Sequence, residues 1–301
     1  MDRKYVFILI FFALGLSACD SNDSDGDATL RLSFNGLDPL TNGFHYEGWA
    51  VIGGSATTTG KFNISATGAI VDLSGSAIAN GEFDTGLDLD MATTFILTIE
   101  PSGDTDTVPS STHLVGGDFA GDTASLSIAH GSSLGSDFTG ATGDYILATP
   151  TNGADNDENS GIWFLDLSSG SPEAGLSLPT LPAGWLYEGW VVIDGTPVTS
   201  GTFTSASGVD DADPFSGVEA GPPFPGEDYL VNAPTGLSFP TDLAGMTAVI
   251  SIEPSPDSDP GPFTLKPLVG QIPGGALDHT VYSMDNNATA SSPSGTARVV
   301  N

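Results

Sequence analysis

Residues 46–62 read YEGWAVIGGSATTTGKF, and residues 187–203 repeat them as YEGWVVIDGTPVTSGTF without a gap, at an offset of 141. A second segment recurs downstream, because TIEP at 98–101 returns as SIEP at 251–254, at an offset of 153. Self-similarity over such a distance indicates a tandem duplication of one structural unit. The difference of twelve between the offsets predicts an insertion in the second copy, and we assign it to the acidic stretch 210–229.

The boundary between the copies follows from their closing strands. SGIWFLDL at 160–167 corresponds to SGTARVVN at 294–301, so each copy is expected to end with its own apolar strand. SSGSPEAG, which follows the first closing strand, has a composition typical of a linker. These features predict a first domain at 28–170 and a second at 171–301.

Both copies have the pattern of antiparallel β-structure. The chain holds 39 glycines and 21 prolines, and after residue 19 no convincing window shows apolar residues at helical spacing. Short β-branched and aromatic runs, separated by Gly, Pro, Asp and Asn, are typical of an all-β protein. We therefore predict two tandem antiparallel β-sandwich (Ig-like) domains.

The YEGW segment predicts a strand, a tight turn and a second strand. Alternation along YEGWAV places Trp49 and Val51 on one face, as core candidates, and Gly48 on the other, where it allows a close approach. The Gly-Gly at 53–54 and the Asp-Gly at 194–195 supply the positive φ that a hairpin turn needs.

The N-terminus has the features of a bacterial lipoprotein leader. Arg3 and Lys4 precede twelve apolar residues at 5–16, fewer than the roughly 20 that a membrane-spanning helix needs. LSAC at 16–19 then matches the lipobox, which the lipoprotein signal peptidase reads. We predict a signal peptide at 1–18.

Cys19 is the one cysteine of 301 residues, so no disulfide can form within the chain. Acylation, with palmitate among the acyl chains, explains a cysteine at this place. The acidic segment 19–27 that it opens is predicted to be a tether. We expect the mature protein in the cell envelope, lipid-anchored outside the cytoplasm, with inner and outer membrane left open.

The charge is strongly negative, at −32 for the whole chain. Removing residues 1–18 leaves 37 acids and 4 bases, a formal charge of −33. Such a surface repels phosphates, which excludes nucleic acid as a partner. Three interpretations stay open: a surface adapted to high salt, a calcium-binding envelope protein, or an acidic surface without either role.

Two acidic loops are candidate calcium sites, because Ca²⁺ takes six to eight oxygen ligands and clustered carboxylates supply several. The alternative is solvated loop charge. No catalytic constellation emerges, since the four histidines are scattered along the sequence. The candidate calcium ligands are Asp155, Asp157 and Glu158 in one loop and Asp210, Asp211 and Asp213 in the other.

Two glutamates recur at equivalent positions, Glu47 with Glu188 and Glu100 with Glu253. They could form a repeated ligand or ion site. Alternatively, each is a structural carboxylate that accepts backbone or Trp N–H bonds at a strand edge. The repeated framework comprises Tyr46, Glu47, Trp49 and Glu100 in the first copy and Tyr187, Glu188, Trp190 and Glu253 in the second.

The repeated motifs resemble the extracytoplasmic C-terminal domain of anti-sigma-K factors. That family shows a Tyr-x-x-Trp strand, a turn, a Gly-x-Phe strand and a later strand ending in Glu-Pro. The matching residues are Tyr46/Trp49, Gly60/Phe62 and Glu100-Pro101, then Tyr187/Trp190, Gly201/Phe203 and Glu253-Pro254. The regulatory members also carry a cytoplasmic sigma-binding domain and a transmembrane helix, and this sequence has neither. The resemblance therefore implies the envelope-side module alone, duplicated.

We expect a non-enzymatic, lipid-anchored envelope protein that binds or senses through protein contacts, with an unidentified envelope protein as partner. A calcium-dependent adhesion or surface-structural module is the main alternative, with Ca²⁺ as the one cofactor considered. An enzyme acting on envelope glycans is a more distant alternative.

Overall fold

The structure, a computed structural model, describes residues 28–153, 156–257 and 259–300. Cys19, the signal peptide and the tether lie outside the described residues, as does Asp155 of the first acidic loop. Along the described ranges, no helix is both long and apolar enough to cross a membrane.

The all-β prediction is confirmed. Two large antiparallel sheets contain most of the regular structure in the described part of the chain, and one short hairpin accompanies them. The helical segments are a single α-helical turn and three 3₁₀ turns, again among the described residues. They are α1 (Ala288–Ser291), η1 (Ala79–Gly81), η2 (Pro150–Asn152) and η3 (Glu158–Ser160).

The first sheet forms what we call the N-terminal lobe. Its order is β4-β3-β2-β6-β7-β8-β20-β1-β5. The strands are β1 (Thr29–Asn35), β2 (His45–Ile52), β3 (Ser55–Ile64), β4 (Ile70–Val71), β5 (Glu82–Asp84), β6 (Ala92–Glu100), β7 (His113–Ala120), β8 (Thr123–Ser127) and β20 (Ser294–Val300). The sheet curls until its ends meet, because the Phe62 ring on β3 lies 5.7 Å from Phe34 on β1 and 5.6 Å from Phe83 on β5.

The second sheet forms the C-terminal lobe, in the order β15-β14-β17-β18-β19-β9-β10-β16, with β13 also paired to β9. The strands are β9 (Thr142–Leu147), β10 (Gly161–Trp163), β13 (Leu176–Ser177), β14 (Trp185–Ile193), β15 (Thr196–Phe203), β16 (Gly226–Asp228), β17 (Thr247–Pro254), β18 (Leu268–Gln271) and β19 (Tyr282–Asn286). The small hairpin is β11 (Leu165–Asp166) with β12 (Glu173–Ala174). Its ends also meet, since the Tyr229 hydroxyl after β16 donates to the carbonyls of Val198 and Thr199 on β15.

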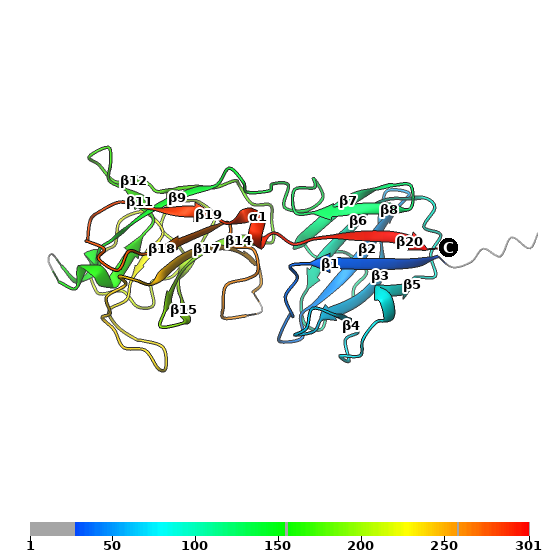
Figure 1. The fold of residues 1–301 in the computed structure, drawn as a ribbon, viewed down its shortest axis with the longest axis horizontal. Helices are drawn as coiled ribbons and strands as arrows, with labels where there is room; N and C mark the ends of the chain where they lie inside the picture. Colours follow the sequence, from blue (N-terminus) through cyan, green and yellow to red (C-terminus); the bar gives the residue numbers. More distant parts are fainter. Residues whose placement is uncertain (1–27, 154–155, 258, 301) are drawn as a thin grey trace, which may run out of the picture.

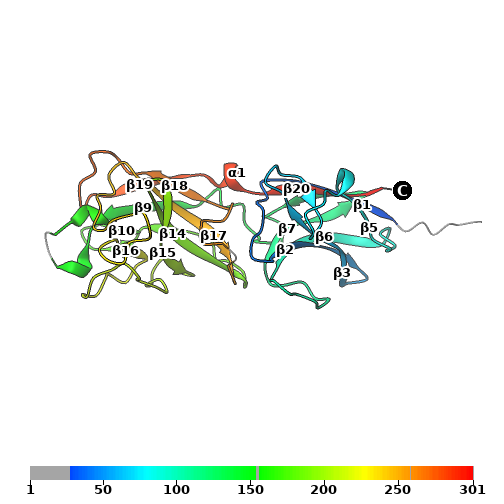
Figure 2. The ribbon, with the colours of Figure 1, turned by 90° about the horizontal axis from the view of Figure 1, so that it is seen from below.

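The two lobes lie end to end (Figures 1 and 2). The start of β1 and the end of β20 pair with each other, Thr29 opposite Val300, at the outer end of the N-terminal lobe. The loops around η2 and η3 lie at the opposite end of the molecule.

The predicted boundary at 170/171 is wrong, because each copy contributes its last strand to the other lobe. β9 follows the strands of the first copy but inserts between β19 and β10 of the C-terminal lobe. β20 ends the second copy but inserts between β8 and β1 of the N-terminal lobe. Alternation tells which face a strand buries and not which sheet accepts it, so the sequence pattern fits both arrangements.

The predicted equivalence of 160–167 with 294–301 is wrong for the same reason. β10 pairs with β16, with Ile162 opposite Glu227, as β1 pairs with β5, with Leu30 opposite Phe83. Residues 161–163 therefore correspond to the start of β1. By their place in the two sheets, β9 and β20 are the equivalent pair.

The alternation along β2 is confirmed, but the face assigned to the core is wrong. Tyr46 and Ala50 lie in the apolar interior, together with Phe95 on β6. Trp49 is also buried, yet its indole points to the other face, where Nε1 donates to the hydroxyl of Thr98. The close approach at Gly48 is real, because a Cβ there would lie 2.9 Å from the Phe95 ring.

Both hairpin turns form as predicted. Gly53 and Gly54 have φ of 59° and 83°, and Asp194 and Gly195 have φ of 50° and 83°. Two successive residues with positive φ twist the hairpin to match its strands. The turns hold β2 against β3 and β14 against β15.

Candidate functional site

The face of the sheet opposite the apolar interior carries a polar network in both lobes. In the N-terminal lobe, Trp49 Nε1 donates to Thr98 Oγ1 at 2.9 Å, and that hydroxyl donates to Glu100. Glu100 Oε1 also accepts the backbone N–H of Ser110 at 3.0 Å. The carboxylate thus fastens the loop after β6 to the sheet.

The C-terminal lobe repeats this network. Trp190 Nε1 donates to Ser251 Oγ at 2.8 Å, and Ser251 donates to Glu253. Glu253 Oε1 accepts the backbone N–H of Phe263 at 2.8 Å. These contacts support the structural interpretation of Glu100 and Glu253, with the refinement that a hydroxyl stands between the indole and the carboxylate.

Glu47 and Glu188 also occupy matching environments. Each accepts a hydrogen bond through Oε1 from a threonine on the neighbouring strand, Thr58 in one lobe and Thr199 in the other. Both glutamates are buried, with 1% and 7% of their surface exposed. Since one oxygen of each is used in this way, the second oxygen decides what else the site can hold.

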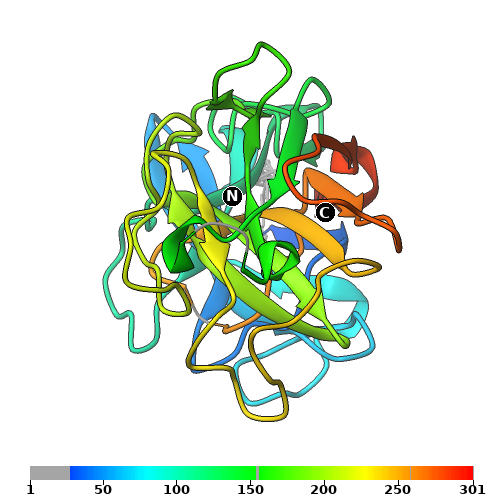
Figure 3. The ribbon, with the colours of Figure 1, turned by 90° about the vertical axis from the view of Figure 1, so that its left-hand side faces the viewer.

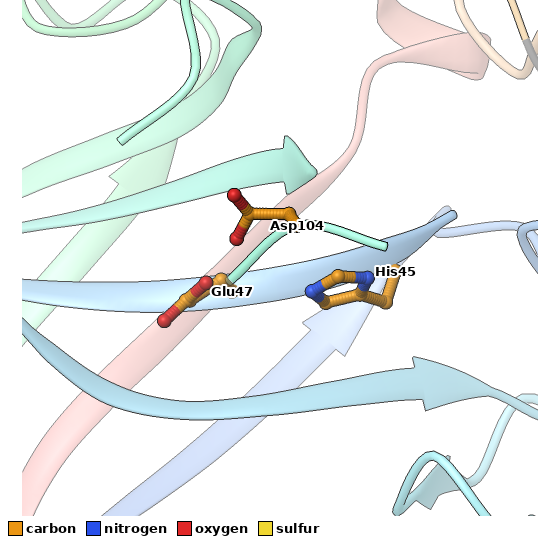
Figure 4. A group of neighbouring side chains, drawn as sticks. All are labelled: His45, Glu47 and Asp104. Carbon is orange, nitrogen blue, oxygen red and sulfur yellow. The ribbon is translucent and has the colours of Figure 1, made fainter. Parts of the chain in front are cut away.

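In the N-terminal lobe the second oxygen faces a cluster of charged side chains. His45 and Glu47 come from β2, and Asp104 comes from the loop after β6 (Figure 4). One ligand atom from each lies within 4.8 Å of the other two, the one such group among the described residues. One imidazole nitrogen and two carboxylates are a donor set that can bind a transition metal.

Lys61 already places a positive charge in this cluster. Its Nζ lies 2.8 Å from Asp104 Oδ2 and 3.3 Å from Glu47 Oε2. The hydrogen bond from Lys61 lowers the pKa of Asp104. Burial by itself lowers the pKa of Lys61, but hydrogen bonds and charge interactions with Asp104 and Glu47 outweigh this effect and raise the pKa above its ordinary value. The ammonium therefore neutralises the carboxylates, and a metal would have to displace it.

The C-terminal lobe repeats the carboxylates, but the lysine is not repeated. Leu186 stands where His45 stands in the first copy, and Thr202 pairs opposite Glu188 where Lys61 pairs opposite Glu47. Burial, together with the charge of Asp257, raises the pKa of Glu188 to about 7. Burial raises the pKa of Glu253 to about 8.

The first predicted calcium loop lies at the outer end of the C-terminal lobe. Asp157 and Glu158 line an open hollow of about 500 Å³, and sequence reasoning did not foresee that Asp242 and Asp278 would join them from two other loops. Glu158 Oε2 accepts the backbone N–H of Thr149 at 3.1 Å. Four carboxylates therefore converge, but no three of them place ligand atoms within 4.8 Å among the described residues.

The second predicted loop lines a smaller hollow of about 250 Å³, where Asp210, Asp211 and Asp213 meet. Asp210 Oδ2 accepts the backbone N–H of Gly226 at 2.9 Å, so this loop folds back onto the start of β16. The Asp211 carboxylate accepts hydrogen bonds from the backbone N–H and from the hydroxyl of Thr202. Two of the three acids thus hold the loop in place.

Glu227 and Asp228 on β16 are buried and hydrogen-bonded. Asp228 accepts from Trp163 Nε1 at 2.7 Å and from the backbone N–H of Thr151 at 2.8 Å, and Glu227 accepts from Ser216. Burial raises the pKa of Asp228, and that of Glu227 to about 7. The sequence analysis included both acids in the acidic stretch 210–229, whereas the structure places them on a strand.

Sequence reasoning also missed the cluster around Lys61. The signal was present in GKF of the first copy against GTF of the second, and in an aspartate four residues after Glu100 and after Glu253. Lys61 and Asp104 are 43 residues apart in the chain, however, so the sequence alone does not show that they meet.

No protein-family model, curated protein or solved structure matches the chain. The resemblance to the anti-sigma-K module therefore stays a prediction that rests on the repeated motifs.

Proposed function

We propose that the chain is a lipid-anchored cell-envelope protein without catalytic activity, which binds a basic segment of a partner protein through the outer end of its C-terminal lobe. The observation that carries this proposal is the position of the acidic hollow at the end of the molecule farthest from the start of β1.

The anchor sets the direction of the molecule. Eight residues, 20–27, separate the predicted lipidated cysteine from Ala28, whose backbone N–H donates to the carbonyl of Leu87 beside β5. A tether that short keeps the N-terminal lobe next to the membrane. The C-terminal lobe then points away, with the loops of its outer end (Figure 3) presented to other molecules.

The outer end has the chemistry of a binding surface for a basic partner. Carboxylates from three loops line the hollow, and Leu277 lies among them with 68% of its surface exposed. An apolar side chain beside several like charges suits a lysine- or arginine-containing segment with an apolar residue. The net charge of the chain adds long-range attraction for such a segment.

The test is photo-crosslinking in living cells of the source organism. A photoreactive amino acid at Asp242 or Asp278, at the outer end, is compared with one at Asp122, whose carbonyl accepts from Val299 at the membrane end. We expect a discrete crosslinked protein from the two outer positions, and we expect the crosslink from position 278 to be lost in the double variant D157N/D242N. Crosslinking from Asp122 alone, or equally from all three positions, contradicts the proposal.

Calcium-dependent adhesion is the second candidate function. The observation that favours it is the set of buried carboxylates in the C-terminal lobe, which form no ion pair with a lysine among the described residues, whereas Glu47 in the N-terminal lobe pairs with Lys61.

A further inference from the structure

The two lobes provide a comparison within one molecule. Glu47 pairs opposite Lys61 between β2 and β3, and Glu188 pairs opposite Thr202 between β14 and β15. The threonine that binds Oε1 is present in both. The backbone frame is therefore the same, and the side chain that supplies the positive charge is present in one lobe alone.

The second carboxylate of the frame is also conserved between the lobes. Asp104 lies four residues after Glu100, and Asp257 lies four residues after Glu253. Each accepts a backbone N–H from two residues further on, at 3.3 Å from Asp106 and at 3.0 Å from Asp259. The two aspartates thus occupy the same turn above the sheet, and Lys61 fills the space between sheet and turn in the N-terminal lobe.

A buried oxygen in the C-terminal lobe lacks a hydrogen bond. Glu253 is 1% exposed, and within the described residues its Oε2 has no hydrogen-bond partner. The charges of Glu188 and Asp257 both act on this carboxyl group. A buried carboxylate oxygen without a partner is costly. Glu47 Oε2 also lacks a hydrogen bond, but it forms an ion pair with Lys61 at 3.3 Å, whereas Glu253 forms no ion pair among the described residues. The arrangement calls for a cation.

Lys266 does not meet this need. The charge of Glu253 acts on Lys266, but the lysine ammonium donates to the carbonyl of Phe263 at 2.6 Å. Among the described residues Lys266 forms no ion pair within 4.0 Å. Burial lowers the pKa of Lys266, which further weakens it as a counter-charge.

We propose that the C-terminal lobe binds a divalent cation between Glu188, Glu253 and Asp257, at the place that corresponds to the Lys61 ammonium of the N-terminal lobe. Asp211, fastened to Thr202, lies at the rim and adds negative charge. The donors are all oxygens, because Leu186 replaces the imidazole of His45. Oxygen donors with variable geometry select Ca²⁺, and water completes its six to eight ligands.

This site differs from both acidic loops singled out in the sequence. Of its proposed ligands, Glu188 and Glu253 belong to β14 and β17, and their backbones are paired in the sheet. In this structure Glu188, Glu253 and Asp257 do not place ligand atoms within 4.8 Å of one another. A cation there would draw the loop after β17 toward β14, as Lys61 joins β2 to the loop after β6 in the other lobe.

The test is calorimetric titration of the mature chain, carrying Cys19→Ser to keep it soluble, with CaCl₂ at constant ionic strength. We expect one site per chain. Thr202→Lys introduces the ammonium of the N-terminal lobe and should remove that site. Lys61→Thr should create a second site in the N-terminal lobe. Thr202 is half-buried at the sheet surface, and its equivalent is already a lysine, so the variant is expected to fold.

Two controls make each outcome decisive. D157N/D242N changes the acids of the outer hollow and should leave the calcium site intact, while a second double variant, E188Q/D257N, should abolish it. Unchanged binding in Thr202→Lys, with circular dichroism that shows a folded protein, overturns the proposal. Loss of the site in D157N/D242N instead would assign it to the outer hollow, and an absence of calcium binding in the parent chain would also overturn it.

Discussion

Single side chains distinguish two lobes that otherwise share their hydrogen bonds. Tyr46 and Tyr187 each donate a hydroxyl to a backbone carbonyl eight residues earlier in the chain, and both indoles bond to a hydroxyl on the neighbouring strand. Against this constant frame, the exchange of Lys61 for Thr202 changes the electrostatics of the site. Repeat analysis identifies the repeated glutamates from sequence, but their neighbours come from distant parts of the chain and require the structure.

The buried acids predict how stability depends on pH. The folded-state pKa values of Glu188 and Glu253, about 7 and about 8, lie above the value of about 4.5 expected when the chain is unfolded. The folded state therefore binds more protons in this range. The stabilisation is complete below pH of about 4.5 and is lost as the pH rises through about 7 and about 8. We expect the thermal unfolding midpoint of the calcium-free protein to decrease as the pH is raised from 5 to 8.5.

The variants E188Q and E253Q should flatten this dependence. Glu82→Gln is the matched control, because the hydrogen bond that Glu82 accepts from Arg31 lowers the pKa of this carboxyl group. Its contribution is then lost as the pH falls below about 4.5, outside the range tested. Equal slopes in E188Q, E253Q and the parent would show that these carboxyl groups do not titrate as described.

The sequence predicts local strand pairs, but it does not predict which sheet each strand joins. The β2–β3 hairpin and its turn follow from local pattern, and the structure confirms them. Trp49 was predicted to face the core. Its indole is instead buried on the face of the sheet opposite the apolar interior, where it donates a hydrogen bond to Thr98. The exchange of β9 and β20 depends on contacts between the copies, which no local pattern encodes.

The strand exchange predicts which lobe depends on the C-terminus. β20 pairs with β1 from Thr29 to Asn35 and with β8 from Thr123 to Ser127, so its removal opens the N-terminal sheet between β8 and β1. In a chain that ends at Pro293, we expect amide hydrogen exchange in β1 and β8 to become fast, while β14 and β17 stay protected. Selective loss of protection in β14 and β17 would instead place the last strand in the C-terminal lobe.

At the scale of the whole molecule, the charge of −32 and the end-to-end lobes act together. Self-repulsion weakens a compact acidic protein, and salt screens it as the Debye length falls from about 10 Å at 0.1 M to about 3 Å at 1 M. A general salt effect and a specific cation are therefore separable by their concentration ranges. The acidic composition, visible in the sequence, does not distinguish them, because it does not show which carboxylates are buried together.

We infer that a bound cation completes the C-terminal lobe where a lysine completes the N-terminal one. Thermal unfolding of the mature Cys19→Ser chain in millimolar CaCl₂ and in KCl of matched ionic strength tests this inference most directly. A specific site adds RT ln(1 + [L]/Kd), about 2.7 kcal/mol at a hundredfold excess over Kd, so we predict a higher midpoint in calcium and no such difference in Thr202→Lys. Equal midpoints in CaCl₂ and matched KCl would contradict the claim and leave the acidity as a surface adapted to salt.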